Sequence, residues 1–247
     1  MESKTAVVII SILAALLVAG GAFFYVKKTS EPEVVNFNID LGYEKAVADL
    51  KLPGILKDKK PVLVDDLNDL NKWVEEEDYE YNKWAITTKG ALEVKNGVLS
   101  RKNAGNSGLK LKDFEIVDGA IAVRARVTSK PETGAVGFRV HVRNGEEHWS
   151  HGYGLNTSSY SYELSAWHGK DKGKSATLAP TPAKAYLVPE SGWMTVVIVI
   201  QGNKLSYYHD GELVAEVTDE EKSYAKGGVF LSLTHFVEID KVLVYQF

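Results

Sequence analysis

Short runs of alternating apolar and polar residues fill the chain beyond Pro61 and constrain its fold more than any other feature. The runs are broken by Gly, Asn and Asp at the spacing typical of an all-β sandwich or barrel. In residues 134–144, valine and phenylalanine at even positions are expected to face a core, with Arg139, His141 and Arg143 on the opposite face. The pattern predicts an antiparallel β-sandwich with one polar face.

Two dipeptides indicate tight hairpin turns between these runs. Asp210-Gly211 separates two strand-like runs within residues 193–217, and Asn96-Gly97 separates ALEV from VLS. Both central residues of the tightest hairpin turn need a positive φ, which Asn, Asp and Gly adopt more readily than other residues. We therefore expect a pair of antiparallel strands around each dipeptide.

An uncharged apolar run of 21 residues, 6–26, precedes this part of the chain. At about 1.5 Å per helical residue, such a run is long enough to cross the hydrocarbon core of a bilayer, which is about 30 Å thick. Lys27 and Lys28 follow as a polar stop, so we interpret residues 1–28 as a transmembrane anchor. A cleaved signal peptide is the alternative, because residues 18–22 are small enough to resemble a cleavage region.

Residues 29–60 mix charges with scattered apolar side chains and contain Pro32 and Pro53. We interpret them as a stalk that joins the anchor to a β domain at residues 61–247. Residues 43–50 have the apolar spacing of two helical turns, which favours a semi-ordered stalk. A wholly flexible tether is the alternative.

Charge and cysteine content exclude several classes of function. The formal net charge of the 247 residues is −4, so the chain lacks the positive field that attracts nucleic acid. The sequence has no cysteine, which excludes disulfides, thiolate zinc sites and a cysteine nucleophile. Nucleic acid is therefore not an expected partner.

Five segments in order along the chain support a family resemblance. They are LVDDLNDLNKW, ALEVKNGVLS, GAVGFRVHVRN, SGWMTVVIVIQGNKLSYYHDGELVAEVTD and GGVFLSLTHFVEIDKVLVYQF. Over residues 62–247 the chain resembles concanavalin A-like lectin/glucanase jelly-roll domains, particularly the laminin G-like and keto-disaccharide-hydrolase-like branches. The resemblance implies two antiparallel sheets, one convex and one concave, with ligands held on the concave face or at its rim.

Aromatic and histidine side chains gather in the segment HWSHGYGLNTSSYSYELSAWHG. Aromatic faces pack against the apolar faces of sugar rings, and neighbouring polar groups bond the hydroxyls. The candidate ligand-binding residues are Trp149, Tyr153, Tyr162 and Trp167, joined by Arg139 and His141. The alternative is that strand alternation places Tyr160, Tyr162 and Leu164 in the core and leaves Glu163, Ser165 and Trp167 outside.

Acidic residues near both ends of the β domain suggest a calcium site. Asp65 and Asp66 begin the domain and Asp240 nearly ends it. Oxygen ligands of this kind suit calcium, and the resemblance implies it because related sandwiches often bind this ion. Capping and turn formation are the alternative roles for these side chains. The spacing His148-x-x-His151 lacks a third zinc ligand, so zinc is not expected.

The sequence matches only part of the carboxylate pattern of a glucanase. Glu238 and Asp240 alternate on one expected strand, but position 243, where a third carboxylate is needed, is Leu243. No catalytic residue is assigned on this basis.

The sequence favours a single-pass membrane protein that displays an extracellular β domain which binds glycan or matrix without catalysis. The extracellular placement follows from the resemblance, because Lys4 before the anchor and Lys27 and Lys28 after it do not decide the orientation. A glycoside hydrolase of the keto-disaccharide-hydrolase type is one alternative. A structural subunit of a surface assembly, with a surface protein as its partner, is the other.

Overall fold

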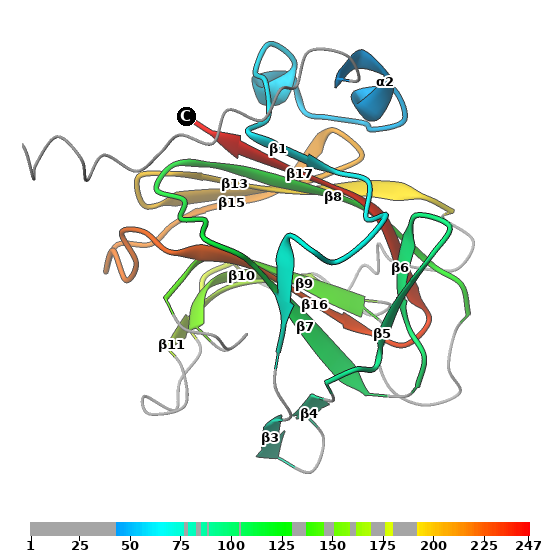
Figure 1. The fold of residues 1–247 in the computed structure, drawn as a ribbon. Helices are drawn as coiled ribbons and strands as arrows, with labels where there is room; N and C mark the ends of the chain where they lie inside the picture. Colours follow the sequence, from blue (N-terminus) through cyan, green and yellow to red (C-terminus); the bar gives the residue numbers. More distant parts are fainter. Residues whose placement is uncertain are drawn as a thin grey trace, which may run out of the picture. The chain divides into compact units, whose positions relative to one another are not determined.

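The structure, a computed structural model, describes much of the β domain and the segment before it (Figure 1). The described residues are 43–76, 79–82, 85–87, 89–103, 105–129, 137–145, 151–158, 162–168, 176–179 and 192–247. Within these ranges no helix is long and apolar enough to cross a membrane. The anchor expected at residues 1–28 lies outside them.

The first layer, sheet A, is built from eight strands of the described chain, all of them antiparallel to their neighbours. In spatial order these are β15 (Glu212–Thr218), β14 (Lys204–His209), β13 (Met194–Gln201), β8 (Gly119–Val127), β17 (Val237–Gln246), β6 (Val98–Arg101) and β5 (Leu92–Lys95), with β1 (Leu63–Asp65) also paired to β17. The C-terminal strand β17 therefore lies near the middle of the sheet.

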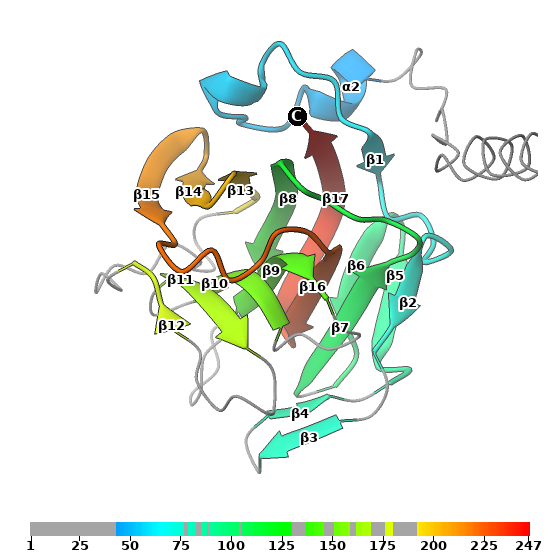
Figure 2. The ribbon, with the colours of Figure 1, turned by 90° about the vertical axis from the view of Figure 1, so that its left-hand side faces the viewer.

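The second layer, sheet B, contains nine strands of the described chain. Its order is β12 (Ala176–Thr177), β11 (Tyr162–His168), β10 (His151–Ser158), β9 (Gly137–Asn144), β16 (Gly228–Thr234), β7 (Asn106–Leu111), β4 (Ala85–Thr87) and β3 (Tyr79–Asn82), with β2 (Trp73–Glu75) also paired to β7. All pairs are antiparallel except a parallel bridge between β4 and β7. Figure 2 shows the two layers from the side. This arrangement confirms the two-sheet antiparallel sandwich.

The two expected hairpin turns are present, and their backbone geometry explains them. Asp210 and Gly211, between β14 and β15, have φ values of 50° and 86°. Asn96 and Gly97, between β5 and β6, have φ values of 55° and 72°. Positive φ at both central residues matches the turn twist to the strand twist, so these two dipeptides set the register of both hairpins.

A continuous apolar core lies between the sheets. Sheet A contributes Ile121 and Val123 from β8, and sheet B contributes Phe138, Val140 and Leu155 from β9 and β10, each at most 1% exposed. The even positions of β9 face this core, as the alternation predicted. Of the odd positions, Arg139 and His141 lie on the opposite side of the strand. Arg143, which was expected beside them, has a positive φ of 53° and is only 3% exposed, and its guanidinium lies 5.8 Å from the ring of the core residue Tyr153, so the expected alternation ends before Arg143.

A second apolar cluster covers the outer face of sheet A. Residues 43–60, which we call the strap, include the helical turns α2 (Tyr43–Val47) and η1 (Gly54–Leu56). Leu50 and Leu56 of the strap pack with side chains of β8, β13 and β17, and Leu56 is fully buried. The backbone N–H of Lys51 also donates to Thr195 Oγ1 at 3.0 Å. Residues that the sequence indicated as part of a stalk are thus packed onto the domain.

Candidate functional site on the outer face of sheet B

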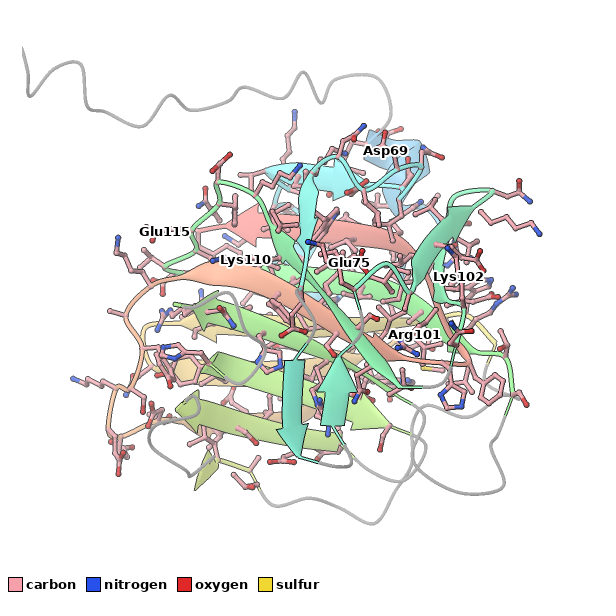
Figure 3. The ribbon with its side chains drawn as sticks, turned by 60° about the horizontal axis from the view of Figure 1, so that its bottom comes forward. Asp69, Glu75, Arg101, Lys102, Lys110 and Glu115 are labelled. Atoms are coloured by element: carbon pink, nitrogen blue, oxygen red, sulfur yellow. The ribbon has the colours of Figure 1, made fainter. Side chains whose placement is uncertain are left out.

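The outer face of sheet B carries polar side chains from β9, β10 and β11. On sheet A, the strap already packs against the corresponding side of β8, β13 and β17. On sheet B, strand register decides which side chains share the outer face, since directly paired residues of antiparallel strands point to the same side. Figure 3 views the molecule from the sheet B side.

One row of polar residues crosses five strands of this face, and we call it the central row. Its members are Glu163 on β11, Asn156 on β10, Arg139 on β9, Ser232 on β16 and Gly108 on β7, each paired with the next. Arg139, Asn156 and Glu163 are partly exposed. Because neighbouring strands are about 4.8 Å apart, these three side chains form a contiguous polar strip.

Glu76 completes the central row at the end of β2. Its backbone N–H donates to the Gly108 carbonyl oxygen at 2.8 Å, which continues the pairing of β2 with β7. A Cβ atom at Gly108 would lie 2.6 Å from Glu76 Oε2 and would collide with Cζ of Phe230. Glycine at this position therefore makes room for the Glu76 carboxylate, whose residue is only 5% exposed.

Arg139 lies in the field of two carboxylates. Burial, the strongest influence, lowers the pKa of the Arg139 guanidinium, and the charges of Glu163 and then Glu76 act in the opposite direction. A guanidinium does not lose its proton under ordinary conditions, so Arg139 remains a cation that can only donate hydrogen bonds. Across the sheet, the charged groups of the row are thus an acceptor (Glu163), a donor (Arg139) and a second acceptor (Glu76).

Two hydroxyl groups orient the carboxylate of Glu163. The Ser165 and Thr177 hydroxyls both donate to Glu163 Oε1, the latter at 3.1 Å. Ser165 is paired directly with Thr177 between β11 and β12, so the edge of sheet B supplies both donors. A carboxylate held by two donors keeps a fixed direction, which is what a recognition site requires.

A second row runs beside the central row and is more apolar. His141 on β9 is paired with Gly154 on β10 and with Phe230 on β16. His141 and Phe230 are fully buried, and their rings meet edge to face with centroids 6.0 Å apart. Gly154 contributes no side chain between His141 and Ser165. Side chains of the second row therefore project from β9 and β11 but not from β10.

The structure divides the predicted ligand-binding residues into three groups. Arg139 and His141 lie on the outer face of sheet B, as described above. Tyr153 and Tyr162 instead belong to the core, with exposures of 0% and 6%, because they alternate with the outward residues of β10 and β11. Trp149 lies outside the described residues, and only the backbone of Trp167 is described, where it pairs with Gly152.

The three aspartates considered for calcium each contact different residues. The buried Asp65 accepts hydrogen bonds from the Trp73 indole at 2.8 Å and from the Leu67 backbone at 3.1 Å. Asp66 pairs with Lys241 at 3.5 Å, and Asp240 pairs with Arg124 at 3.2 Å. Within the described ranges, no group of three or more histidine and acidic side chains is placed to hold a metal ion.

Glu238 and Asp240 belong to sheet A, away from the polar face of sheet B. Glu238 pairs with Arg126 at 2.6 Å, and Asp240 pairs with Arg124. Burial raises the pKa of Asp240, and the Arg124 charge opposes this effect. These carboxylates neutralise arginines of β8, and we assign no site to them.

Solved structures of the same architecture include both binding modules and glycosidases. A carbohydrate-binding module from Bacillus subtilis aligns with a TM-score of 0.50 at 14% identity, over 72% of this chain and 94% of that one. An endo-beta-1,3-glucanase from Pyrococcus furiosus aligns with a TM-score of 0.55 at 17% identity, over 76% of this chain and 95% of that one. At these identities the similarity establishes the concanavalin A-like jelly-roll fold alone.

A third structure of this fold was determined with sugars bound. It is a variant of LamA from Zobellia galactanivorans in complex with laminaritriose and laminaritetraose. It aligns with a TM-score of 0.54 at 16% identity, over 76% of this chain and 99% of that one.

The sequence itself gives the family. No curated protein matches the chain in sequence. The model of the 3-keto-alpha-glucoside-1,2-lyase-like domain matches residues 61–239, which is most of the chain and includes every residue of the central row. The chain therefore belongs to the family of 3-keto-alpha-glucoside-1,2-lyase-like domains.

Proposed function

We propose that the β domain binds a carbohydrate on the outer face of sheet B, through Arg139, Asn156 and Glu163. The observation that carries this proposal is the adjacency of these three partly exposed side chains on β9, β10 and β11. A guanidinium only donates hydrogen bonds, a carboxylate only accepts them, and a carboxamide does both. Sugar hydroxyls do both as well, so neighbouring hydroxyls on a ring can satisfy all three groups.

The rest of the domain supports the same face. The strap packs on sheet A, and its apolar contacts are with β8, β13 and β17 rather than with sheet B. The family is named for an activity on a glucoside, and proteins of the same fold include a carbohydrate-binding module and a complex with laminaritriose. Strand-borne side chains also hold their positions better than loop residues, which favours selective recognition.

A glycan array probed with the full-length chain, with and without calcium, tests this function. The best ligand is then titrated by calorimetry against Asn156→Ala. We expect this change to weaken binding by about tenfold or more, because it removes the central hydrogen-bonding group of the strip.

Glu212→Gln provides the control, because Glu212 is exposed on β15 of sheet A. Its affinity should equal that of the unmodified chain. Equal affinity of Asn156→Ala and the unmodified chain would place the ligand elsewhere. Silence on every glycan would favour a structural subunit of a surface assembly.

Cleavage of a bound sugar is the second candidate function, and the position of Glu76 favours it. Glu76 and Glu163 act on Arg139 from the two ends of the central row. Carboxylates on two sides of a bound sugar can act as general acid and general base, or as acid and nucleophile. Their central guanidinium can hold an oxygen that accumulates negative charge.

Incubation with a 3-keto-alpha-glucoside, followed by detection of the released alcohol, tests catalysis. Glu76→Gln and Glu163→Gln should each abolish release, whereas Glu212→Gln should not change it. Binding without release would leave the domain a carbohydrate-binding module.

We also propose that residues 1–28 anchor the domain at the cell surface. The uncharged run at residues 6–26 supports the anchor, and the proposed carbohydrate ligand supports the outward orientation.

A further inference from the structure

Glu163 has one oxygen directed to its own sheet and one that is available to a ligand. Both hydroxyl donors, Ser165 and Thr177, bond to Oε1. Oε2 receives no hydrogen bond from any residue in the part of the chain that the structure describes. A carboxylate oxygen that is partly removed from water is stabilised by a hydrogen-bond donor, and a ligand hydroxyl would supply one.

The charges of the central row do not cancel. Two carboxylates, Glu163 and Glu76, accompany one cation, Arg139. Lys110 occupies the neighbouring row, but its Cε lies 3.4 Å from a Cβ position at Gly228, so its side chain extends away from the central row. Figure 3 shows Lys110 on the side of Glu115, apart from Arg101. The described side chains of the central row therefore carry one excess negative charge.

An acidic ligand would meet this excess at a site with reduced access to water. Its carboxylate or sulfate would be attracted to Arg139, but Arg139 is already compensated by Glu163 and Glu76. Like charges brought together at an interface repel each other, and this repulsion is a common basis of selectivity. An uncharged hydroxyl, in contrast, can donate to Glu163 Oε2 without repulsion.

We propose that Glu163 makes this site selective for uncharged glycans and excludes glycans that carry a uronic acid or a sulfate beside the bound ring. This inference rests on the proposed carbohydrate-binding function. It adds the charge class of the ligand and names the residue that selects it. Glu163 is then a specificity residue that contacts the ligand.

Calorimetry of the full-length chain with matched ligands tests the proposal. The probes are a neutral gluco-oligosaccharide from the array and its counterparts in which one glucose is replaced by glucuronate or carries a sulfate. We expect the acidic counterparts to bind at least about tenfold more weakly, with a smaller difference at high salt. In Glu163→Gln, the difference should fall below about threefold, mainly because the acidic ligands bind better.

Glu212→Gln serves as the control, since it removes the same charge from sheet A and should preserve the full difference. A neutral ligand that binds while its acidic counterparts bind equally well or better would overturn the inference and leave the binding function intact. A tenfold difference that persists in Glu163→Gln would also overturn it. Absence of binding by every ligand would instead remove the proposed function, and this inference with it.

Discussion

The phenol of Tyr153 donates a hydrogen bond of 2.7 Å to Asp219 Oδ2 and so connects strand β10 to the segment that follows β15. The backbone N–H of Tyr224 donates to the same phenol oxygen at 3.3 Å. Burial, with a further contribution from the bond to Asp219, raises the pKa of Tyr153 to about 12. The phenol therefore stays protonated, and remains a donor, throughout the neutral range.

Tyr153→Phe should lower the free energy of unfolding by about 1–2 kcal/mol, because it removes a donor from the buried Asp219 carboxylate. Urea unfolding of the full-length chain measures the change. Tyr208→Phe is the matched control, since no hydrogen bond of the Tyr208 hydroxyl is found within the described residues, and it should change stability by less than about 0.5 kcal/mol. Equal effects of the two variants would contradict a role for the Tyr153 bond.

Stability should also depend on the ionisation of Asp219. Burial, the strongest single influence, opposes its ionisation, but hydrogen bonds from Tyr153, Ser223 and Glu221 together hold the pKa of Asp219 below its ordinary value. A lowered folded-state pKa contributes stability above the unfolded-state value of about 3.9, and this contribution is lost as pH falls through the folded-state pKa.

Unfolding curves collected from pH 7 down to pH 3 test this dependence. Below about pH 4, the unmodified chain should lose stability more steeply than Asp219→Asn, which has no carboxylate to protonate at this position. Parallel curves for the two proteins would show that Asp219 does not titrate as described.

Gly108→Ala should disturb the central row and the second row beside it. The added methyl group would collide with Phe230 and lie 2.6 Å from Glu76 Oε2, so both side chains must move. We expect a loss of about 1–3 kcal/mol in the free energy of unfolding, as for other overpacked positions. Gly54→Ala is the control, because a Cβ at Gly54 meets no atom within 4 Å. An unchanged free energy of unfolding in Gly108→Ala would mean that the central row accommodates a side chain at this position of β7.

Leu56→Ala should destabilise the domain by about 2–5 kcal/mol, the usual cost of emptying a fully buried leucine site. Leu56 is 0% exposed, whereas its neighbour Ile55 is 37% exposed, so Ile55→Ala should cost far less.

A chain that begins at residue 61 should likewise be less stable than one that begins at residue 39, and should bind a hydrophobic dye. Equal stability of the two truncations would show that sheet A does not need the strap.

Deletion of residues 6–26 should move the protein from the membrane fraction to the soluble fraction, because the only uncharged run of spanning length is removed. Protease added to intact cells should then degrade the β domain of the full-length chain, if that domain faces outward as proposed. Protection of the domain until the cells are lysed would contradict the outward orientation and, with it, a ligand at the cell surface.

Local sequence patterns predicted those features that neighbouring residues decide. The dipeptides at Asn96 and Asp210 identified two hairpins, because their positive φ values are a property of the residues themselves. Alternation also indicated that Glu163 and Ser165 face away from the core while Tyr162 enters it, and the structure confirms this.

The central row could not be predicted in the same way. Glu76 belongs to an acidic run that resembles an ordinary solvated segment, and its position beside Gly108 depends on the long-range pairing of β2 with β7. The position of Asn156 between Arg139 and Glu163 follows only from the pairing of β10 with both β9 and β11. Pairing partners far apart in sequence are selected by the whole fold, so no local pattern brings Glu76, Asn156 and Glu163 together.

The position of the strap also determines how the domain would carry mechanical load. Any force transmitted along the chain from its N-terminal side passes through the strap, which Leu50, Leu56 and the bond from Lys51 to Thr195 hold to sheet A. These contacts all belong to sheet A. Tension on a tether would therefore act first on sheet A, and it would reach a ligand on sheet B only through the core that the two sheets share.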